Sequence, residues 1–513
     1  MRYFDRPPGA GTGKRPFMRS GLAGLLALIL VLSSPAPAVG QDMRSGTVFD
    51  GLPRIGEAAA DELSPQTERD IGEAVRRDFR QQGLLVEDPE LVDYLNQLGD
   101  RLGATGPAAG YSFEFFAVRD NTLNAFAVPG GFIGVHTGLI IAANNESELA
   151  SVLAHEMGHV TQRHIARMLA QGRQSSVVSL ATAVLAVLAA RSNPQAASGL
   201  VALGGGIVQD QMLAFSRDAE READRVGLDI LRQSGFDANA MVAFFGRLQN
   251  ATRIYESGAP TYMRTHPVTT ERMADIQNRL SVERYRQHVD SVEFTLLRAG
   301  LEARVNVGVD GLARARASIE LRLRDRSFVN EAAAHYRLAV VANEQGDHDV
   351  AREALAATRT SLGASHAMLE RLAIDIDMRD ARHEAALAAS TEALAAFPSS
   401  RALVQQHGAL LLRMARFEEA ANYLESQVRR YRADSALWRM LSEARFGAGQ
   451  PIAGRRAAAE HYALDGGLLA AIEQLRIAQR EAGRSFYVGS QIDARLRELQ
   501  ARYTREQASI GGQ

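Results

Sequence analysis

A regular spacing in the C-terminal part most restricts what this 513-residue chain can fold into. Three segments align with one another, at 346–351 (GDHDVA), 381–386 (ARHEAA) and 415–420 (ARFEEA), and a weaker fourth begins at Gly449. Segments that recur about every 34 residues are typical of a repeating unit of two helices and a turn. One such unit cannot bury its apolar side alone. From about residue 325 onward, the chain is therefore expected to form stacked helical pairs.

The repeat period is typical of tetratricopeptide repeats. His348, His383, Phe417 and Pro451 take equivalent places in the four units and are spaced by 35, 34 and 34 residues. Such repeats stack into an α-solenoid whose concave face binds proteins or peptides. An unrelated helical bundle is the alternative. We predict a tetratricopeptide-repeat domain over residues 326–505.

The N-terminus has the layout of a signal peptide. A basic patch at 14–19 precedes an apolar run at 21–32 (GLAGLLALILVL), and small residues follow. The apolar run is shorter than the ~20 residues that a membrane helix needs. We expect residues 1–40 to be a signal peptide cleaved after Ala38 or Gly40, which predicts export to the periplasm. An uncleaved membrane anchor is the alternative.

Composition excludes several kinds of site. The chain has 58 Lys and Arg against 60 Asp and Glu, so no basic excess indicates nucleic-acid binding. It has no cysteine, which excludes disulfides, thiolate nucleophiles and Cys-ligated zinc. Any metal site must therefore use histidines and carboxylates. The 14-residue apolar run at 177–190 is too short to span a bilayer, and we expect a buried helix there rather than membrane contact.

Between residues 64 and 170 the patterns predict helices and a few strands. Ser64-Pro65 and Asp88-Pro89 are typical helix starts, with a capping side chain followed by proline. The aromatic stretch 111–118 predicts a strand, and 124–140 predicts a strand or hairpin broken at Pro129-Gly130-Gly131. Residues 146–170 are expected to form one largely buried helix.

That buried helix carries the motif HExxH, as His155-Glu156-Met157-Gly158-His159. Four residues of α-helix turn about 400°, so His155 and His159 lie on one face and can reach one metal ion. Glu156 lies one position round, where it can take a proton from a metal-bound water. The motif predicts a zinc site with Glu156 as general base. Two solvated histidines on a surface helix are the alternative.

A catalytic zinc needs a third protein ligand, and spacing alone does not identify it. His164 is five residues after His159, which puts it about 140° away on a continuous helix. We therefore interpret His164 as a surface residue or as one that supports a ligand from behind. A carboxylate on a later helix is the other candidate.

A later helix carries Glu-x-x-x-Asp, in the sequence FSRDAEREADRVG at 215–227. Together with HExxH, this order resembles the M48 family of gluzincin metallopeptidases. Segments 124–131 (NAFAVPGG), 134–139 (GVHTGL) and 265–267 (THP) before Arg272 also fall where that family has such segments. The resemblance covers roughly residues 55–290. It implies a mainly α-helical peptidase domain with a small β-sheet, ahead of the α-solenoid of repeats.

The resemblance makes Glu220 the third ligand, beside His155 and His159, of one Zn2+ per chain. Asp224, one turn later on the same face, is then placed to accept a hydrogen bond from a ligand imidazole. Glu222 is the competing ligand candidate, although it points about 160° away from Asp224.

The resemblance also implies roles for His266 and Arg272. In similar periplasmic proteases, a histidine of this segment occupies the zinc's fourth position and holds the enzyme latent. The alternative for His266 is that it braces its loop through Pro267. Arg272 is a candidate for stabilising the oxyanion of the tetrahedral intermediate, and a structural salt bridge is the alternative.

The segment around Asn124, Phe126 and Val128 is a candidate substrate-binding edge strand. Its Pro129-Gly130-Gly131 break is tolerated at a sheet edge, where an extended substrate can add as a further strand. His136 in the same region is interpreted as a packed side chain.

Together these features predict a periplasmic zinc metalloendopeptidase that hydrolyses exported proteins. The predicted divisions are a peptidase domain at 41–300, a helical connector at 301–325 and the repeats at 326–505. The resemblance adds chaperone-like quality control of outer-membrane protein assembly. Its partners would be unfolded or stalled outer-membrane proteins and, through the repeats, their assembly machinery, with peripheral membrane contact. The alternative is a repeat-based chaperone or assembly adaptor whose zinc site is mainly structural or latent.

Overall fold

The structure is a computed structural model that describes residues 63–165, 167, 184, 217–254, 261–281, 287–305, 308–482 and 486–511. The predicted signal peptide lies outside these residues. So does the predicted apolar helix at 177–190, apart from Val184, which is buried. None of the helices within the described ranges is long and apolar enough to cross a membrane.

A four-stranded sheet forms the floor of the N-terminal half, with strand order β1-β2-β4-β3. β2 (Glu114–Val118) runs parallel to β4 (Phe132–His136). β1 (Leu85–Val86) pairs antiparallel with β2, and β3 (Ala125–Val128) pairs antiparallel with β4. β3 is therefore an edge strand among the described strands. The strand predicted at 111–118 and the hairpin broken at the proline and glycines are confirmed.

The β3–β4 hairpin depends on two glycines. Gly130 and Gly131 have φ of 80° and 88°, and a Cβ on Gly131 would lie 2.1 Å from the carbonyl oxygen of Ser112. Only glycine fits this conformation and this approach. The extended segment ends earlier than predicted, because Thr137–Ala142 forms the short helix α3. There the N–H of Gly138 donates to the Asp120 carbonyl, which turns the chain into the helix.

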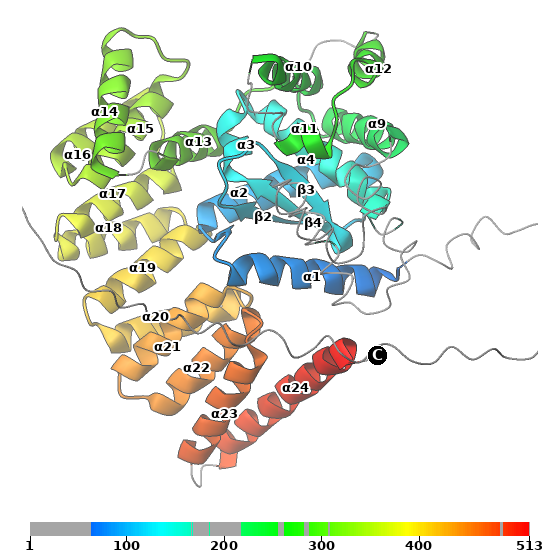
Figure 1. The fold of residues 1–513 in the computed structure, drawn as a ribbon. Coiled ribbons are helices and arrows are strands. Elements are labelled where there is room, and N and C mark those ends of the chain that lie inside the picture. Colours follow the sequence, from blue (N-terminus) through cyan, green and yellow to red (C-terminus); the bar gives the residue numbers. More distant parts are fainter. Residues whose placement is uncertain are drawn as a thin grey trace, which may run out of the picture. The chain divides into compact units, whose positions relative to one another are not determined.

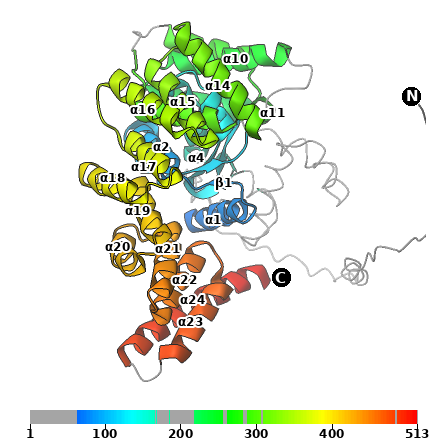
Figure 2. The ribbon, with the colours of Figure 1, turned by 90° about the vertical axis from the view of Figure 1, so that its left-hand side faces the viewer.

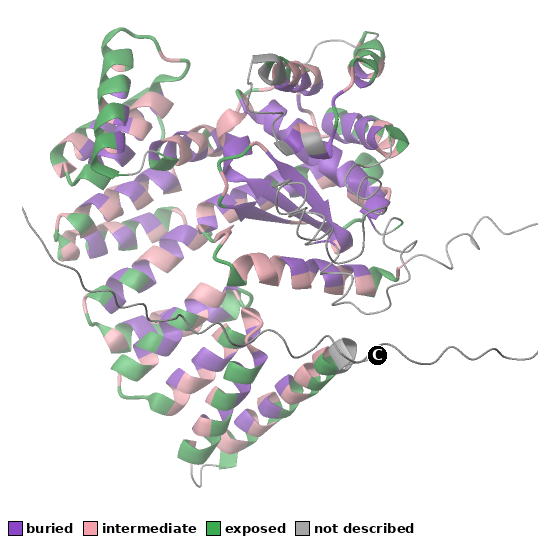
Figure 3. Cartoon of the chain, viewed as in Figure 1, coloured by how far each residue is buried: buried purple, intermediate pink, exposed green. Residues whose placement is uncertain are grey.

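Three helices pack against this sheet, namely α1 (Pro65–Gln81), α2 (Pro89–Gly103) and α4 (Glu146–Thr161), and α9 (Arg217–Gln233) packs on α4. The predicted helix starts are confirmed, since Ser64 caps α1 and Asp88 caps α2 through their side-chain oxygens. The sheet and α4 form the most completely buried part of the molecule (Figure 3). α4 is shorter than predicted, because the helix ends at Thr161 rather than near residue 170.

Three further helices complete the N-terminal half: α10 (Asn239–Ile254), α11 (Thr261–Thr265) and α12 (Thr270–Leu280). α10 packs against α4 and α12, and α12 also contacts α9 (Figure 1). The segment between α11 and α12 is therefore held close to α4.

The C-terminal half is a stack of helical pairs (Figures 1 and 2). His348, His383, Phe417 and Pro451, which are equivalent in the sequence, are each the first residue of the second helix of a pair. This confirms the predicted α-solenoid. The helices are α13 (Val292–Val305), α14 (Gly308–Arg324), α15 (Glu331–Gln345), α16 (His348–Leu362), α17 (Ala367–Arg379), α18 (His383–Ala396), α19 (Arg401–Arg413), α20 (Phe417–Arg430), α21 (Ser435–Gly447), α22 (Pro451–Leu464), α23 (Leu468–Ala482) and α24 (Phe486–Gly511).

Ion pairs connect the repeats with α2. Arg371 of α17 lies 2.8 Å from both Asp88 and Glu90, and Arg401 of α19 lies 2.6 Å from Asp93. The residues from Ala59 to Gln513 accordingly form one compact unit. The domain limits predicted at residues 300 and 325 stay predictions.

The turn between the two helices of a pair repeats in detail. Gly346, Ala381, Ala415 and Gly449 occupy the same position, with positive φ of 80°, 57°, 55° and 71°. In each turn the next residue donates its N–H to a carbonyl five residues back, at 2.8–2.9 Å. This left-handed turn satisfies carbonyls at the helix C-terminus. Two units use glycine and two use alanine, for which the left-handed conformation costs roughly 1–2 kcal/mol.

We therefore expect Ala381→Gly and Ala415→Gly each to raise the free energy of unfolding of the repeats by about 0.5–1 kcal/mol, after the flexibility of glycine in the unfolded chain is subtracted. Chemical denaturation followed by the fluorescence of Trp438, the chain's one tryptophan, measures this in the repeat domain. The control is Ala388→Gly at an exposed position inside α18, which should lower stability by a similar amount. A loss of stability in all three variants would contradict the argument.

Candidate metal centre

Four side chains from three parts of the chain meet at one buried point. His155 and His159 come from α4, Glu220 from α9, and His266 from the residue after α11. Their candidate ligand atoms lie within 4.8 Å of one another, and each residue is at most 2% exposed. His155 Nε2 and His159 Nε2 are 3.1 Å apart, and His159 Nε2 is 3.4 Å from Glu220 Oε1. The predicted ligand set is thus gathered at one point, together with His266.

The donor set fits a divalent transition metal. At 3.1 Å, the two Nε2 atoms leave room for at most one proton between them, and a buried cluster of imidazoles with a carboxylate is costly without compensation. Two imidazoles and one carboxylate are a recurrent ligand set of catalytic zinc. A metal ion at this point would take the lone pairs that the cluster presents.

Metal binding requires neutral imidazole and ionised carboxylate, a condition that His159 and Glu220 meet and that His155 meets only when the metal displaces its proton. Burial holds the pKa of His159 well below its usual value. Burial alone would raise the pKa of Glu220, but His266, His155 and His159 hold it well below that of an ordinary glutamate. Burial lowers the pKa of His155, but its contacts with Asp224 and Glu220 outweigh this effect and raise that pKa to about 9.

Two glycines let α4 and α9 approach closely enough to complete the site. A Cβ on Gly158 would lie 2.8 Å from the Ala223 carbonyl oxygen, and one on Gly227 would lie 2.9 Å from the Cα of His155. The helices therefore touch backbone to backbone, and Glu220 extends toward the histidines. Neither glycine is predicted from the sequence as a contact point, although Gly158 lies inside HExxH.

Asp224 and Arg272 brace the ligands from behind. Asp224 Oδ1 lies 3.0 Å from His155 Nδ1, as expected for a carboxylate that orients a ligand imidazole. Arg272 donates to both oxygens of Asp224, at 2.6 and 2.7 Å, and to the Pro267 carbonyl at 2.8 Å. It also lies 2.8 Å from Glu220 Oε2. Because all these contacts occupy a buried guanidinium, they favour the salt-bridge interpretation of Arg272 over the oxyanion role.

Glu156 connects the cluster with the edge strand. Its Oε2 accepts a hydrogen bond from the backbone N–H of Ala127 at 2.9 Å, and its Oε1 lies 3.3 Å from His266 Nε2. Glu156 is fully buried, and burial raises the pKa of its carboxyl. The arrangement gives one carboxylate oxygen to β3 and leaves the other facing the cluster.

The candidate substrate strand β3 has two distinct backbone sides. Asn124 accepts from the His136 N–H on β4, so by alternation Asn124, Phe126 and Val128 direct their backbone groups to β4. Ala125 and Ala127 direct theirs to the outer edge. The predicted strand is present, but an added peptide would pair with the backbone groups of these two alanines, except the Ala127 N–H, which Glu156 occupies.

The segment that carries His266 packs tightly on the cluster. The ring of Tyr262, in α11, lies 4.8 Å from that of His266, and its backbone N–H donates to the Leu123 carbonyl just before β3. The Tyr262 hydroxyl is buried and has no hydrogen-bond partner among the described residues. Tyr262 belongs to no motif, so the sequence gives no signal for its place beside the cluster.

Three other candidates lie outside the cluster. Glu222 has a side chain that is 45% exposed and contacts His164 and Arg167 rather than the ligand group. His164 is buried beside His159. His136 is buried and its Nδ1 lies 3.0 Å from the Thr122 hydroxyl, as expected for a packed side chain.

Comparison with known proteins identifies the family. The family model described as "Peptidase family M48" matches residues 87–280. The β-barrel assembly-enhancing protease of Escherichia coli (strain K12) is 32% identical over 498 residues, which cover 95% of this chain and 98% of that protein. The protein of that name from Yersinia pestis is 30% identical, covering 95% of this chain and 100% of its own length. This chain is a member of peptidase family M48.

The M48 assignment confirms the family resemblance and makes the chain a metallopeptidase. A signal-like segment, an HExxH domain and C-terminal repeats together predict a likeness to the β-barrel assembly-enhancing protease, and the near full-length match confirms that likeness. A shorter member, the metalloprotease LoiP of Escherichia coli (strain K12), is 28% identical over 38% of this chain and 72% of its own length.

If Glu220 is the third ligand of this M48 peptidase, Glu220→Gln should lower metal affinity by about 10-fold or more, because a neutral amide replaces the one charged ligand. Elemental analysis of the purified protein after dialysis against a mild chelator measures the metal retained. The control is Asp218→Asn on the same helix, where the carboxylate is 89% exposed. Full metal retention in Glu220→Gln would point to another carboxylate.

Proposed function

We propose that this metallopeptidase is a periplasmic zinc endopeptidase that acts in the assembly of outer-membrane β-barrel proteins. The observation that carries the proposal is the buried group of His155, His159 and Glu220 beside Glu156, which is itself bonded to an edge strand. His2Glu is a ligand set of zinc peptidases, and one Zn2+ per chain follows from one such group.

The proposed chemistry assigns proton transfer to Glu156. When bound, the metal would supply a Lewis acid and a water of lowered pKa. Glu156 would act as the proton carrier: its Oε1, which faces the cluster, would accept a proton from that water, while Oε2 accepts the hydrogen bond of the Ala127 N–H. The same carboxyl would return the proton to the leaving amine. Its raised pKa suits the first step, because a carboxyl that holds the proton more firmly is a better base.

The substrate is proposed to bind as an extended strand along β3. Main-chain hydrogen bonds to the outer edge give affinity without requiring a particular sequence. This mode suits unfolded or stalled proteins, which expose extended backbone. Folded β-barrels have all strands paired and would be poor substrates.

His266 is proposed as a latch on the metal. Its Nδ1 lies 2.8 Å from Glu220 Oε1 and 3.4 Å from His155 Nε2, so it shares the ligand group. In the fourth ligand position it would take the place of the reacting water, and hydrolysis would wait until its segment moves. The alternative, bracing of the loop through Pro267, is supported by the Arg272 contact to that carbonyl.

The clients and the compartment are proposed from the relatives and the N-terminus. The relatives from Escherichia coli and Yersinia pestis are called β-barrel assembly-enhancing proteases, and the match extends through the repeats. A signal peptide at 1–40 would bring the chain to the periplasm, where such clients pass. Contact with the assembly machinery is assigned to the repeats.

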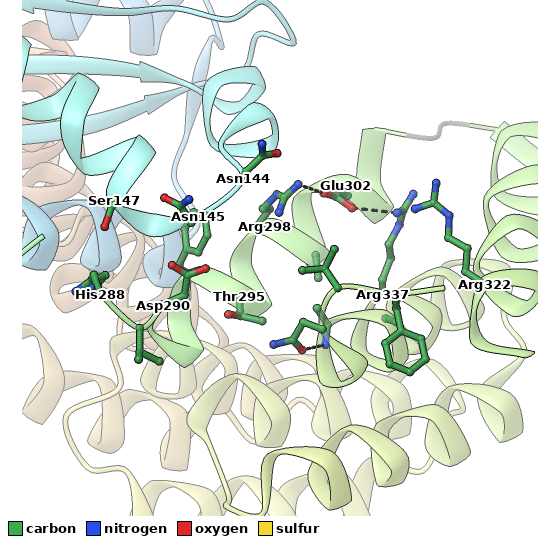
Figure 4. A pocket seen from close by; sticks show the side chains of 18 of the residues that line it. Asn144, Asn145, Ser147, His288, Asp290, Thr295, Arg298, Glu302, Arg322 and Arg337 are labelled. Atoms are coloured by element: carbon green, nitrogen blue, oxygen red, sulfur yellow. Dashed lines mark hydrogen bonds and ion pairs between the residues drawn. The ribbon is translucent and has the colours of Figure 1, made fainter. Parts of the chain in front are cut away.

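One surface supports a protein-binding role for the first helical pairs. A pocket of about 560 Å³ lies between the start of α4 and helices α13 to α15 (Figure 4). Arg298 and Arg337 both pair with Glu302 along its wall, and Arg322 extends beside Arg337. On its rim Val289 is 81% exposed and Val329 is fully exposed. Apolar side chains beside guanidinium groups are typical of protein contact surfaces.

The second candidate function is a chaperone or assembly adaptor with a latent metal site. It is favoured by the presence of His266 within the ligand group. It differs from the endopeptidase in one respect, because an adaptor does not need Glu156 for its activity.

Elemental analysis of the mature protein should find one zinc per chain, which His155→Ala loses. Glu156→Gln should keep that zinc and lower kcat on an unfolded substrate such as casein by about 10²–10⁴-fold, because only the proton transfer is removed. Zinc-free wild-type protein would refute the enzymatic proposal. Assembly function that survives in Glu156→Gln would favour the adaptor.

His266→Ala should raise basal casein hydrolysis several-fold, because a latch competes with water for the metal. The measurement compares initial rates at matched zinc content. The control is His136→Asn, which changes a buried histidine that is not part of the ligand group. A lower rate in His266→Ala would mean that His266 serves catalysis or loop structure.

A further inference from the structure

The chain changes direction immediately after the helix that carries HExxH. α4 ends at Thr161, and Arg163 adopts a left-handed conformation with φ of 53°. This conformation is unfavourable for a residue with a side chain and persists only where the surroundings impose it. The Arg163 guanidinium donates to the Glu68 carboxylate of α1 and to the Leu63 carbonyl, which hold the turn in place.

The turn brings His164 onto His159. On a continued helix the two side chains would diverge by about 140°. Instead, His164 Nδ1 lies 2.9 Å from His159 Nδ1, the ring centroids are 4.9 Å apart, and His164 is only 6% exposed. On its other side, His164 Nε2 lies 3.0 Å from Glu222 Oε2. A continuous path thus runs from the candidate ligand through a second imidazole to a carboxylate.

The path has one consistent direction of hydrogen bonding. With His159 Nε2 committed to the metal, its Nδ1 carries the proton and is a donor. His164 Nδ1 must then accept, so the proton of His164 is on Nε2. That Nε2–H donates to Glu222, and an ionised carboxylate can only accept. Each atom in the path therefore has one role.

We propose that His164 is a positioning residue for the metal ligand His159 and that Glu222 fixes the tautomer of His164. The inference rests on the proposed metal site. With this arrangement, each ligand histidine is oriented by a carboxylate. Asp224 contacts His155 directly, whereas Glu222 acts on His159 through His164. Partners of this kind orient the ligand ring and make it a stronger base toward the metal.

The test measures the dissociation constant of zinc alone by competition with a chelator, on the mature full-length protein. His164→Phe keeps an aromatic ring and removes the acceptor, and it should weaken zinc binding by about 10–100-fold. His164→Asn loses ring volume, but its Oδ1 stands where Nδ1 stood and accepts from His159, so affinity should return most of the way. If His164 only fills space, the order is reversed, with His164→Phe the better binder. That order would overturn the proposal.

A second set of variants tests the outer end of the path, where substitution does not disturb the core. Glu222→Ala should weaken zinc binding several-fold, and Glu222→Gln should restore most of it, because the amide oxygen accepts from His164 Nε2. Asp218→Asn, at an exposed carboxylate on the same helix, should match the wild type. Unchanged affinity in Glu222→Ala would refute the tautomer role of Glu222. Wild-type protein without measurable zinc affinity would refute the metal site itself, and the inference with it.

Discussion

The metal centre depends on how closely α4 and α9 approach each other. A glycine on each helix lies against the other's backbone, at positions where any Cβ would come within 3 Å of a neighbouring main-chain atom. Helices usually cross at 8–10 Å, with side chains between them. Here the short approach lets a carboxylate as short as glutamate extend from one helix to the imidazoles of the other. The sheet and α10 both pack on α4 and support this pair of helices.

Burying so much charge at one place requires that each charge has a partner. The Arg272 guanidinium pairs with both Asp224 and Glu220, so one cation balances the two carboxylates that contact the ligand histidines. The same guanidinium also holds the Pro267 carbonyl, next to His266. The segment that carries His266 is therefore tied to the group that orients the ligands. Movement of that segment and the geometry of the ligands are expected to be coupled.

The sequence predicted what depends on local periodicity and missed what depends on a single unusual backbone angle. His155, Glu156 and His159 follow from helical spacing, and the repeats follow from their period, because both signals are carried by neighbouring residues. Glu220 came only from the family resemblance, since no local rule relates it to HExxH. The contact between His164 and His159 could not be read from the sequence, because a left-handed arginine at 163 has no sequence signal. The strand predicted to residue 140 failed for a similar reason, as a tertiary hydrogen bond at Gly138 starts a helix instead.

The hydrogen bond between Ala127 and Glu156 has a consequence for where a bound chain is cut. The outer edge of β3 has backbone groups that an added strand can pair with, but the Ala127 N–H already donates to the Glu156 carboxylate. A peptide lying along β3 therefore meets one rung that cannot pair. That gap lies beside Glu156, so the unpaired point of the strand would coincide with the proposed point of proton transfer. If a substrate binds along β3 as proposed, this missing bond would define the position along the strand at which the peptide is cut, without any preference for its sequence.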